Sequence, residues 1–209
     1  MALPLQIRLP TVEEVEAARN EFRGFGPDLF YRAATEVIDL SVREVTRLSV
    51  PEALGVLLKT WNNNFYRFRG GFSEGHLSDI ENLVNCHREQ IAAFRLRSIE
   101  SLAISDEAVI VSIFSDFEKK LGPVGSAKCL HLLAPRFFPL WGREISRAHG
   151  IRLETGPRNA ALYFRFMGYT KQQCDALGKA GETYPDLLKA IDEYNYCSYT
   201  LKPKKPKKG

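Results

Sequence analysis

The chain is organised around residues 121–128, which read Leu121-Gly122-Pro123-Val124-Gly125-Ser126-Ala127-Lys128. Two glycines enclose a Pro-Val pair, and because glycine can adopt a positive φ while proline fixes its own φ, the segment predicts a tight turn. Residues 126–133 then follow an apolar pattern that predicts a helix. Backbone amides point outward at a helix N-terminus, where the helix dipole favours an anion. The stretch therefore predicts a phosphate-binding turn, and a plain connector between two helices is the alternative.

The charge pattern favours a polyanionic partner. Residues 119–171 contain ten lysines and arginines and two acidic residues, a formal charge of +8. The whole chain carries +4, and five of its lysines lie in the tail 202–209, so residues 1–201 carry −1. A basic segment inside an otherwise acidic body is typical of proteins that bind a polyanion. We expect residues 1–201 to form a single unit and the tail 202–209 to be disordered and basic.

Composition limits the other classes of function. An apolar content of 44% and an aromatic content of 11% are those of an ordinary globular protein. No apolar run approaches the ~20 residues of a membrane helix, and the first residues lack a signal-peptide pattern. The four cysteines are too far apart in sequence for the paired spacings of metal sites. We expect a cytoplasmic monomer with no metal, no cofactor and no membrane partner.

Helical signals predominate along the chain, and they predict an all-α fold. Thr11 is a candidate N-cap because two glutamates follow in the first turn. The apolar pattern predicts one long helix over residues 76–98, with Ser78 as a possible N-cap. Two shorter helices are predicted at 158–166 and 171–177.

The order of elements over residues 107–150 has a family resemblance. A helix, a G-x-V-G-like turn, a second helix, a proline-bearing link and a helix closed by Arg-x-x-Gly resemble the helix-hairpin-helix/GPD superfamily of DNA glycosylases. The family's turn reads Leu-Pro-Gly-Val-Gly, and here Leu121, Val124 and Gly125 match while the proline and first glycine are exchanged. The segment 139–150 is similar to the family's Pro-Val-Asp segment and the helix that follows it.

The resemblance implies an all-α, helix-hairpin-helix glycosylase-like fold of two helical subdomains with a cleft between them. It also implies that the protein binds double-stranded DNA through backbone amides, extrudes one base and cleaves the N-glycosidic bond of a damaged or modified base. The residues expected to contact DNA are Gly122, Val124, Gly125, Ser126, Lys128, Arg143 and Arg147. Two alternatives remain: a non-catalytic helix-hairpin-helix DNA-binding module, and an unrelated helical protein whose basic segment binds RNA or an acidic protein.

The catalytic residues are where this chain departs from the family. The family's aspartate would fall near Trp141 or Gly142, neither of which carries a charge. Bifunctional members place a Schiff-base lysine two residues after the last glycine of the turn, whereas Lys128 is three residues after Gly125. Lys128 is therefore a candidate nucleophile or, alternatively, a phosphate contact.

A carboxylate is needed near the sugar to stabilise positive charge or to activate water. Glu144 is one candidate, but two residues along a helix is about 200° of rotation from Gly142. We therefore expect Glu144 to point away from the pocket and to pair with Arg143 or Arg147. Asp192, near the C-terminus of the body, is the alternative source.

Aromatic side chains could complete the site by stacking on a base. The candidates for a base pocket are Trp61, Tyr66 and Trp141, and the competing interpretation is that they are core residues. His131 lies three residues after Lys128, and we interpret it as a hydrogen-bonded core histidine rather than as a base.

Overall fold

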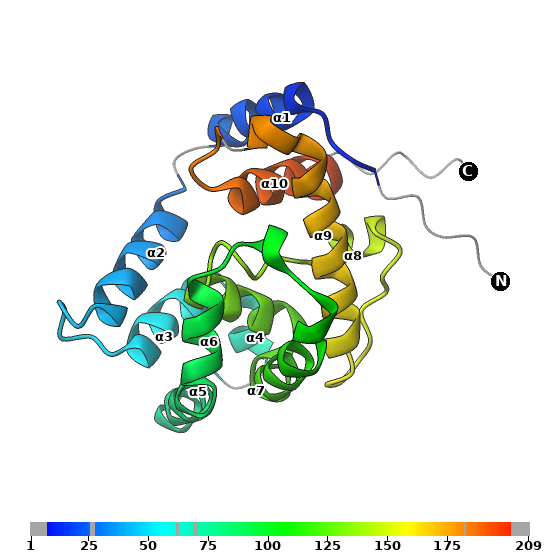
Figure 1. Ribbon diagram of the computed structural model, residues 1–209. Helices are drawn as coiled ribbons and strands as arrows, with labels where there is room; N and C mark the ends of the chain where they lie inside the picture. Colours follow the sequence, from blue (N-terminus) through cyan, green and yellow to red (C-terminus); the bar gives the residue numbers. More distant parts are fainter. Residues whose placement is uncertain (1–7, 26–27, 62, 69–70, 182, 202–209) are drawn as a thin grey trace, which may run out of the picture.

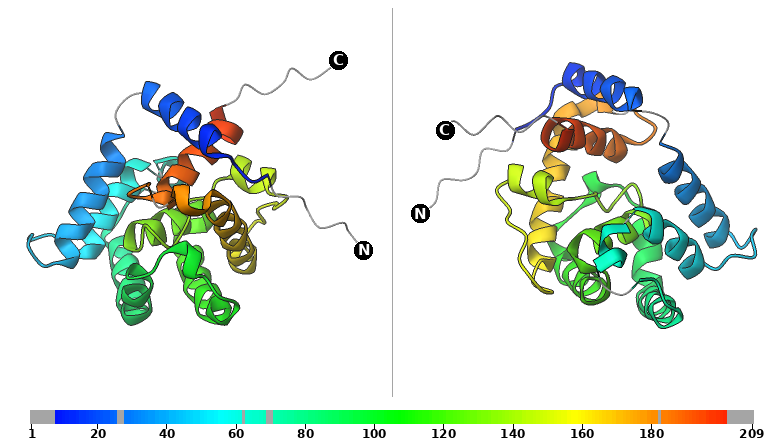
Figure 2. Two further views of the ribbon diagram at one scale, coloured as in Figure 1. Left: turned by 45° about the horizontal axis from the view of Figure 1, so that its top comes forward. Right: turned by 180° about the vertical axis from the view of Figure 1, so that it is seen from behind.

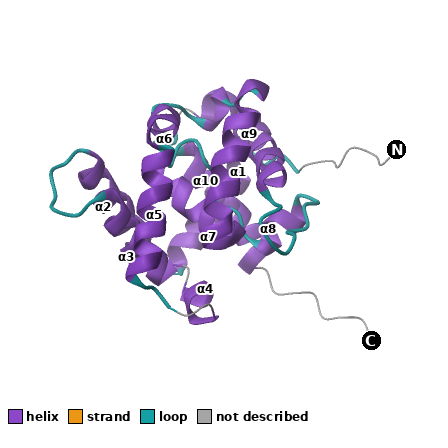
Figure 3. Cartoon of the chain, turned by 90° about the horizontal axis from the view of Figure 1, so that it is seen from below, coloured by secondary structure: helices purple, strands orange, loops and turns teal. Residues whose placement is uncertain are grey.

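Helices make up all the regular secondary structure in the part of the chain that the structure describes. The computed structural model describes residues 8–25, 28–61, 63–68, 71–181 and 183–201, so the predicted tail 202–209 lies outside it. No strand occurs in these residues (Figure 3), which confirms the prediction of an all-α fold. The helices are α1 (Val12–Gly24), α2 (Leu29–Val42), α3 (Val50–Trp61), α4 (Asn63–Phe68), α5 (Glu74–Cys86), α6 (Arg88–Arg95), α7 (Glu107–Leu133), α8 (Arg143–Ala148), α9 (Ala160–Gly181) and α10 (Leu187–Tyr196), with short helical turns at Ile99–Ser101, Ile104–Asp106 and Cys197–Leu201.

The first helix begins as its sequence predicts. The Thr11 hydroxyl accepts a hydrogen bond from the Glu14 amide at 3.3 Å, and the Glu14 carboxylate accepts one from the Thr11 amide at 3.1 Å. This reciprocal pair satisfies two amides that the first turn would otherwise leave without an acceptor. Thr11 is therefore confirmed as the N-cap of α1.

Helix α7 is two helices joined at Gly122. The backbone there has φ 69° and ψ 169°, a conformation that favours glycine, and Pro123 then opens the second half. A Cβ at position 122 would also lie 3.3 Å from the ring of Phe65. The predicted break in the chain at Gly122 is confirmed.

The two halves of α7 run through the centre of the hydrophobic core. On the first half, the ring of Phe114 stacks on Tyr163 of α9, with ring centroids 4.2 Å apart. On the second half, Leu130 and Leu133 are buried in the same cluster. Figures 1 and 2 show α10 lying beside α1 and α9, on the other side of the molecule from α5. This packing brings the C-terminal helix close to the second half of α7.

Two helix boundaries differ from the sequence prediction. The helix expected over residues 76–98 is interrupted at His87, whose ring nitrogen Nε2 lies 3.1 Å from the Asp116 carboxylate of α7, and its N-cap is Ser73 rather than Ser78. The helices expected at 158–166 and 171–177 form the single helix α9. Both differences arise where packing against α7 decides the boundary. Within the described residues, no helix has the length and apolar character needed to cross a membrane.

Candidate active site and nucleic-acid interface

The turn of α7 borders a cleft and contains the backbone amides that begin the second half of the helix. Pro123 has no N–H, and the amides of Val124 and Gly125 belong to the first helical turn, where a helix offers no acceptor of its own. The Ser126 hydroxyl donates to the Gly122 carbonyl at 2.8 Å, and the residue is fully buried. Any anion contact at the turn therefore falls to the amides of Val124 and Gly125, while the Ser126 side chain stabilises the turn from inside.

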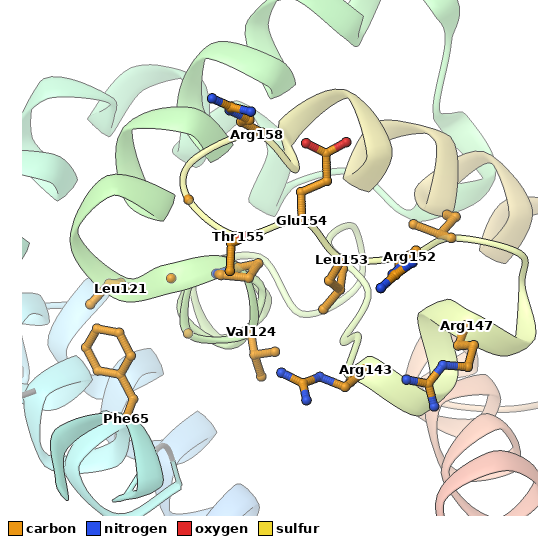
Figure 4. Close-up of a pocket in the computed structure, with 15 residues that line it drawn as sticks. Phe65, Leu121, Val124, Arg143, Arg147, Arg152, Leu153, Glu154, Thr155 and Arg158 are labelled. Atoms are coloured by element: carbon orange, nitrogen blue, oxygen red, sulfur yellow. The ribbon is translucent and has the colours of Figure 1, made fainter. Parts of the chain in front are cut away.

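A cleft of about 840 Å³, here called the arginine cleft, opens beside this turn. It is lined by Phe65, residues 121–125, Arg143 and Arg147 of α8, residues 151–156 and Arg158. Figure 4 shows Arg143, Arg147 and Arg152 projecting toward the same opening. Five of the residues predicted to contact DNA therefore share one surface: Gly122, Val124, Gly125, Arg143 and Arg147.

The charge of the arginine cleft is mostly uncompensated. Arg147 pairs with Glu144 at 2.8 Å, whereas Arg143, Arg152 and Arg158 form no ion pair with any described residue. All four arginine side chains are exposed. Exposed guanidinium groups beside the first turn of a helix form a site suited to an anion such as a phosphodiester.

A second cleft of about 600 Å³, here called the lysine cleft, adjoins the first and shares Val124 and Arg143 with it. Its walls come from α1, the residue before α2, the second half of α7, the start of α8 and the segment before it, α10, and the C-terminal helical turn. It contains four of the residues predicted for the catalytic site or base pocket: Lys128, Trp141, Glu144 and Asp192. Phe22, Asp28, Gly142, Lys189 and Tyr196 also line it.

Burial changes the protonation of the two groups best suited to chemistry here. Burial lowers the pKa of the Lys128 amine to about 8, although Asp192 attracts its positive charge. Burial also raises the pKa of the Asp192 carboxyl to about 6, and Lys189 only partly offsets that effect. At pH 7, about a tenth of Lys128 is therefore the neutral amine, while about nine tenths of Asp192 is ionised. A neutral amine is a nucleophile, and a nearby carboxylate can accept its proton.

Lys189 holds the carboxylate in place. Its ammonium nitrogen lies 3.8 Å from Asp192 Oδ2 and 3.0 Å from Asp28 Oδ2, and 4.7 Å and 4.4 Å from the ring centroids of Phe22 and Tyr31. Burial alone would lower the pKa of Lys189, but the neighbouring carboxylates outweigh it and the pKa is raised overall. Lys189 therefore stays a fixed cation, and Lys128 is the amine that can lose a proton.

Position 142 marks the place where the family resemblance would put an aspartate. Gly142 is the N-cap of α8, its backbone is extended (φ −143°, ψ 174°), and a Cβ there would meet no atom within 4 Å. Glu144 is among the residues that line the lysine cleft, and its predicted pairing with Arg147 is confirmed. Asp192 is thus the carboxylate that α10 brings to the cleft beside Gly142.

The aromatic candidates are separated. Trp141 is buried, lines the lysine cleft, and donates its indole N–H to the Pro123 carbonyl at 2.9 Å, which ties this wall to the turn. Tyr66 lies in a different pocket, where its hydroxyl is 3.0 Å from His76 Nε2. The side chain of Trp61 lies outside what the structure describes. His131 is fully buried between the Tyr31 hydroxyl and the Phe138 carbonyl, as expected of a core histidine.

Four charged residues that contribute to the two clefts were not singled out from the sequence: Arg152, Arg158, Asp28 and Lys189. Arg152 and Arg158 belong to the basic segment 119–171, so the charge count contained them, but no motif marks them individually. Asp28 and Lys189 lie outside that segment, and no spacing in the sequence relates them to the turn. Only folding brings these two residues to the lysine cleft.

Comparisons of the chain with protein-family models, with curated proteins and with solved structures give no match. No group of three or more metal-ligating side chains occurs within the described ranges. The functional argument therefore depends on the geometry of the two clefts.

Proposed function

We propose that this protein is a DNA glycosylase of the helix-hairpin-helix kind, which binds duplex DNA across the arginine cleft and removes a damaged or modified base in the lysine cleft. One observation carries the proposal. An amine of lowered pKa, Lys128, and a carboxylate of raised pKa, Asp192, share a cleft that adjoins a glycine turn and exposed arginines. Perturbed titratable groups in a cleft beside an anion site are typical of catalytic centres.

In this proposal the arginine cleft binds the DNA backbone and the lysine cleft binds the nucleotide that reacts. Phosphates of the DNA backbone bind the amides of Val124 and Gly125 and the guanidinium groups of Arg143 and Arg147, contacts that fix position without reading sequence. An extruded nucleotide enters the adjoining lysine cleft, where Trp141 forms part of the wall. Extrusion is required because the reacting carbon of a paired nucleotide is inaccessible inside the duplex.

In the chemical step, the neutral amine of Lys128 attacks C1′ of the sugar. The new C1′–N bond forms as the C1′–base bond breaks, and the base leaves with the bonding electron pair and is protonated. The attacking nitrogen becomes cationic and passes a proton to the Asp192 carboxylate. The C1′–O4′ bond then breaks as the nitrogen lone pair forms a double bond to C1′, O4′ takes the proton from Asp192, and a protonated imine joins Lys128 to C1′.

Borohydride trapping tests this proposal, because borohydride reduces an imine to a stable amine and leaves a covalent protein–DNA adduct. Duplexes that each carry one damaged base or an abasic site are incubated with the protein and borohydride. We expect an adduct with at least one duplex, and its loss in Lys128→Ala. Lys119→Ala is the matched control, since Lys119 is an exposed lysine on the same helix and pairs with Asp116. An adduct that survives in Lys128→Ala would contradict the proposed nucleophile.

A non-catalytic DNA-binding module is the second candidate, and the observation that favours it is Gly142. A protein of this kind would bind duplex DNA with an affinity that falls as salt rises, because neutralised phosphates release counterions. It would give neither base release nor an adduct on any of the duplexes. The same set of substrates therefore separates the two candidates.

A further inference from the structure

The buried carboxylate of Glu118, on the first half of α7, accepts hydrogen bonds from the end of the loop that forms the far wall of the arginine cleft. Glu118 is 3% exposed, and it accepts two hydrogen bonds from Asn159: one from the side-chain Nδ2 at 2.6 Å and one from the backbone N–H at 3.0 Å. A buried carboxylate is costly unless it is hydrogen-bonded, so both donors are needed to keep it there. Glu118 has no place in the chemistry proposed for the lysine cleft.

Asn159 also forms hydrogen bonds with the loop between α8 and α9, so it connects that loop to Glu118. Its side-chain oxygen accepts from the Glu154 amide at 2.8 Å, and its Nδ2 also approaches the carbonyls of Glu154 and Gly156 at 3.1 and 3.3 Å. Asn159 itself is fully buried, and α9 begins at the next residue. Asn159 therefore links the loop between α8 and α9 to Glu118 on the first half of α7.

The loop between α8 and α9 contributes positively charged side chains to the lining of the arginine cleft. Arg152 and Arg158 stand on either side of its turn, both are exposed, and both line the arginine cleft opposite the glycine turn. In Figure 4 the Glu154 side chain is drawn away from Arg143 and Arg147, so this acid does not occupy the space between the arginines of α8. The loop thus adds Arg152 to the surface formed by α8 and the turn, and it places Arg158 at the far edge of the cleft, where Figure 4 shows its guanidinium directed away from the arginines of α8.

We propose that the loop 152–158 is a second phosphate-binding element of the arginine cleft, and that Glu118 is the positioning residue that holds its arginines in place through Asn159. The proposal rests on the proposed binding of nucleic acid. The turn and α8 bind one phosphate of a DNA strand, Arg152 binds a neighbouring phosphate, and Arg158 binds a further one at the edge of the cleft. Because the loop is fastened before DNA arrives, less conformational freedom is lost on binding.

A cycle of substitutions tests the proposal, with the affinity for a duplex and its salt dependence as the readout. Glu118→Gln keeps the size of the side chain but turns an NH₂ group toward one of the two N–H donors of Asn159. We expect it to weaken binding by roughly threefold or more at about 0.1 M salt, and to lower the salt slope. Arg152→Ala/Arg158→Ala should lower the salt slope by about two units, since each arginine accounts for about one.

The decisive result is how the two changes combine. If Glu118 acts through the loop arginines, adding Glu118→Gln to Arg152→Ala/Arg158→Ala leaves the affinity unchanged. Equal weakening by Glu118→Gln in both backgrounds, or undiminished binding by the arginine variant, would overturn the proposal. Should Glu118→Gln fail to fold, Asn159→Ser serves instead, because serine keeps a favoured N-cap for α9 while losing the side-chain donor to Glu118. Failure of the unaltered protein to bind any duplex would instead contradict the proposed function.

Discussion

The arginine cleft and the lysine cleft share Val124 and Arg143 but present opposite physical environments. The arginine cleft is bordered by exposed guanidinium groups. In the lysine cleft the Lys189 and Asp192 side chains are each only 12% exposed, and burial has moved the pKa values of Lys128 and Asp192 toward each other. The first cleft is suited to attracting an anion from solution, and the second to exchanging a proton.

This difference has a measurable consequence. Interactions of exposed charges are screened by salt, whereas those of buried charges are screened much less. Salt should therefore weaken association at the arginine cleft and have little effect on the rate of a bound complex. The four predictions below test this division between binding and chemistry, beginning with the largest effect.

Asp192→Asn should remove chemistry without removing binding. Turnover should fall by about 10²- to 10⁴-fold, the usual contribution of a proton-transfer group, while the salt-dependent affinity for DNA is retained. Single-turnover kinetics and titration with labelled duplex measure the two quantities. Asp175→Asn is the matched control, since Asp175 is an exposed acid on α9 paired with Lys171. Normal turnover in Asp192→Asn would show that the lysine cleft is not the catalytic site.

Asp192→Asn should make the folded protein more stable even though it removes activity. The folded pKa of Asp192, about 6, lies above its ordinary value of 3.8, so its contribution to stability is full below pH 3.8 and is lost as the pH rises through 6. The shift corresponds to about 3 kcal/mol in the free energy of unfolding. Relative to the unaltered protein, Asp192→Asn should therefore gain stability between pH 4 and pH 7, as measured by thermal unfolding.

The rate of the bound complex should rise with pH to a plateau above pH 8. The rate needs Asp192 ionised and Lys128 neutral, so it should rise most steeply below pH 6, by about tenfold per pH unit between pH 6 and pH 8, and then level off. Because about a tenth of Lys128 is neutral at pH 7, raising the pH to 9 should increase the rate up to about tenfold. Single-turnover rates at saturating protein measure this. A rate that is flat from pH 7 to 9 would argue against Lys128 as the nucleophile.

Gly142→Asp should have the smallest effect, and it tests whether the cleft uses a carboxylate at position 142. Its extended backbone suits an N-cap, and an added Cβ meets open space, so the variant should gain a few tenths of a kcal/mol by capping α8. Gly142→Asn is the control that caps without charge. If only the aspartate variant also raises turnover, the cleft uses a carboxylate at this position. Equal turnover in both would leave Asp192 as the sole carboxylate needed.

Local sequence predicts most of what is local in the structure. The Thr11 cap and the break at Gly122 follow from residue types that leave the backbone few alternatives. The basic surface follows from composition only in part. Four of the ten basic residues in 119–171 line the arginine cleft, whereas Lys119, Lys120 and Lys171 pair with acidic residues elsewhere. The split at His87 could not be predicted in this way, because a contact with Asp116 on another helix decides it.

The sequence alone therefore determines that this chain is helical, where its central turn falls, and that the segment containing the turn is basic. Only the tertiary structure decides that Asp192 and Lys189 of α10 reach Lys128 of α7, and that Glu118 holds the loop 152–158. The physical reason is how far apart in the sequence the interacting residues lie. Capping, turn conformation and charge density depend on neighbours along the chain, whereas burial, and the pKa shifts it causes, depend on helices that pack together from distant parts of it.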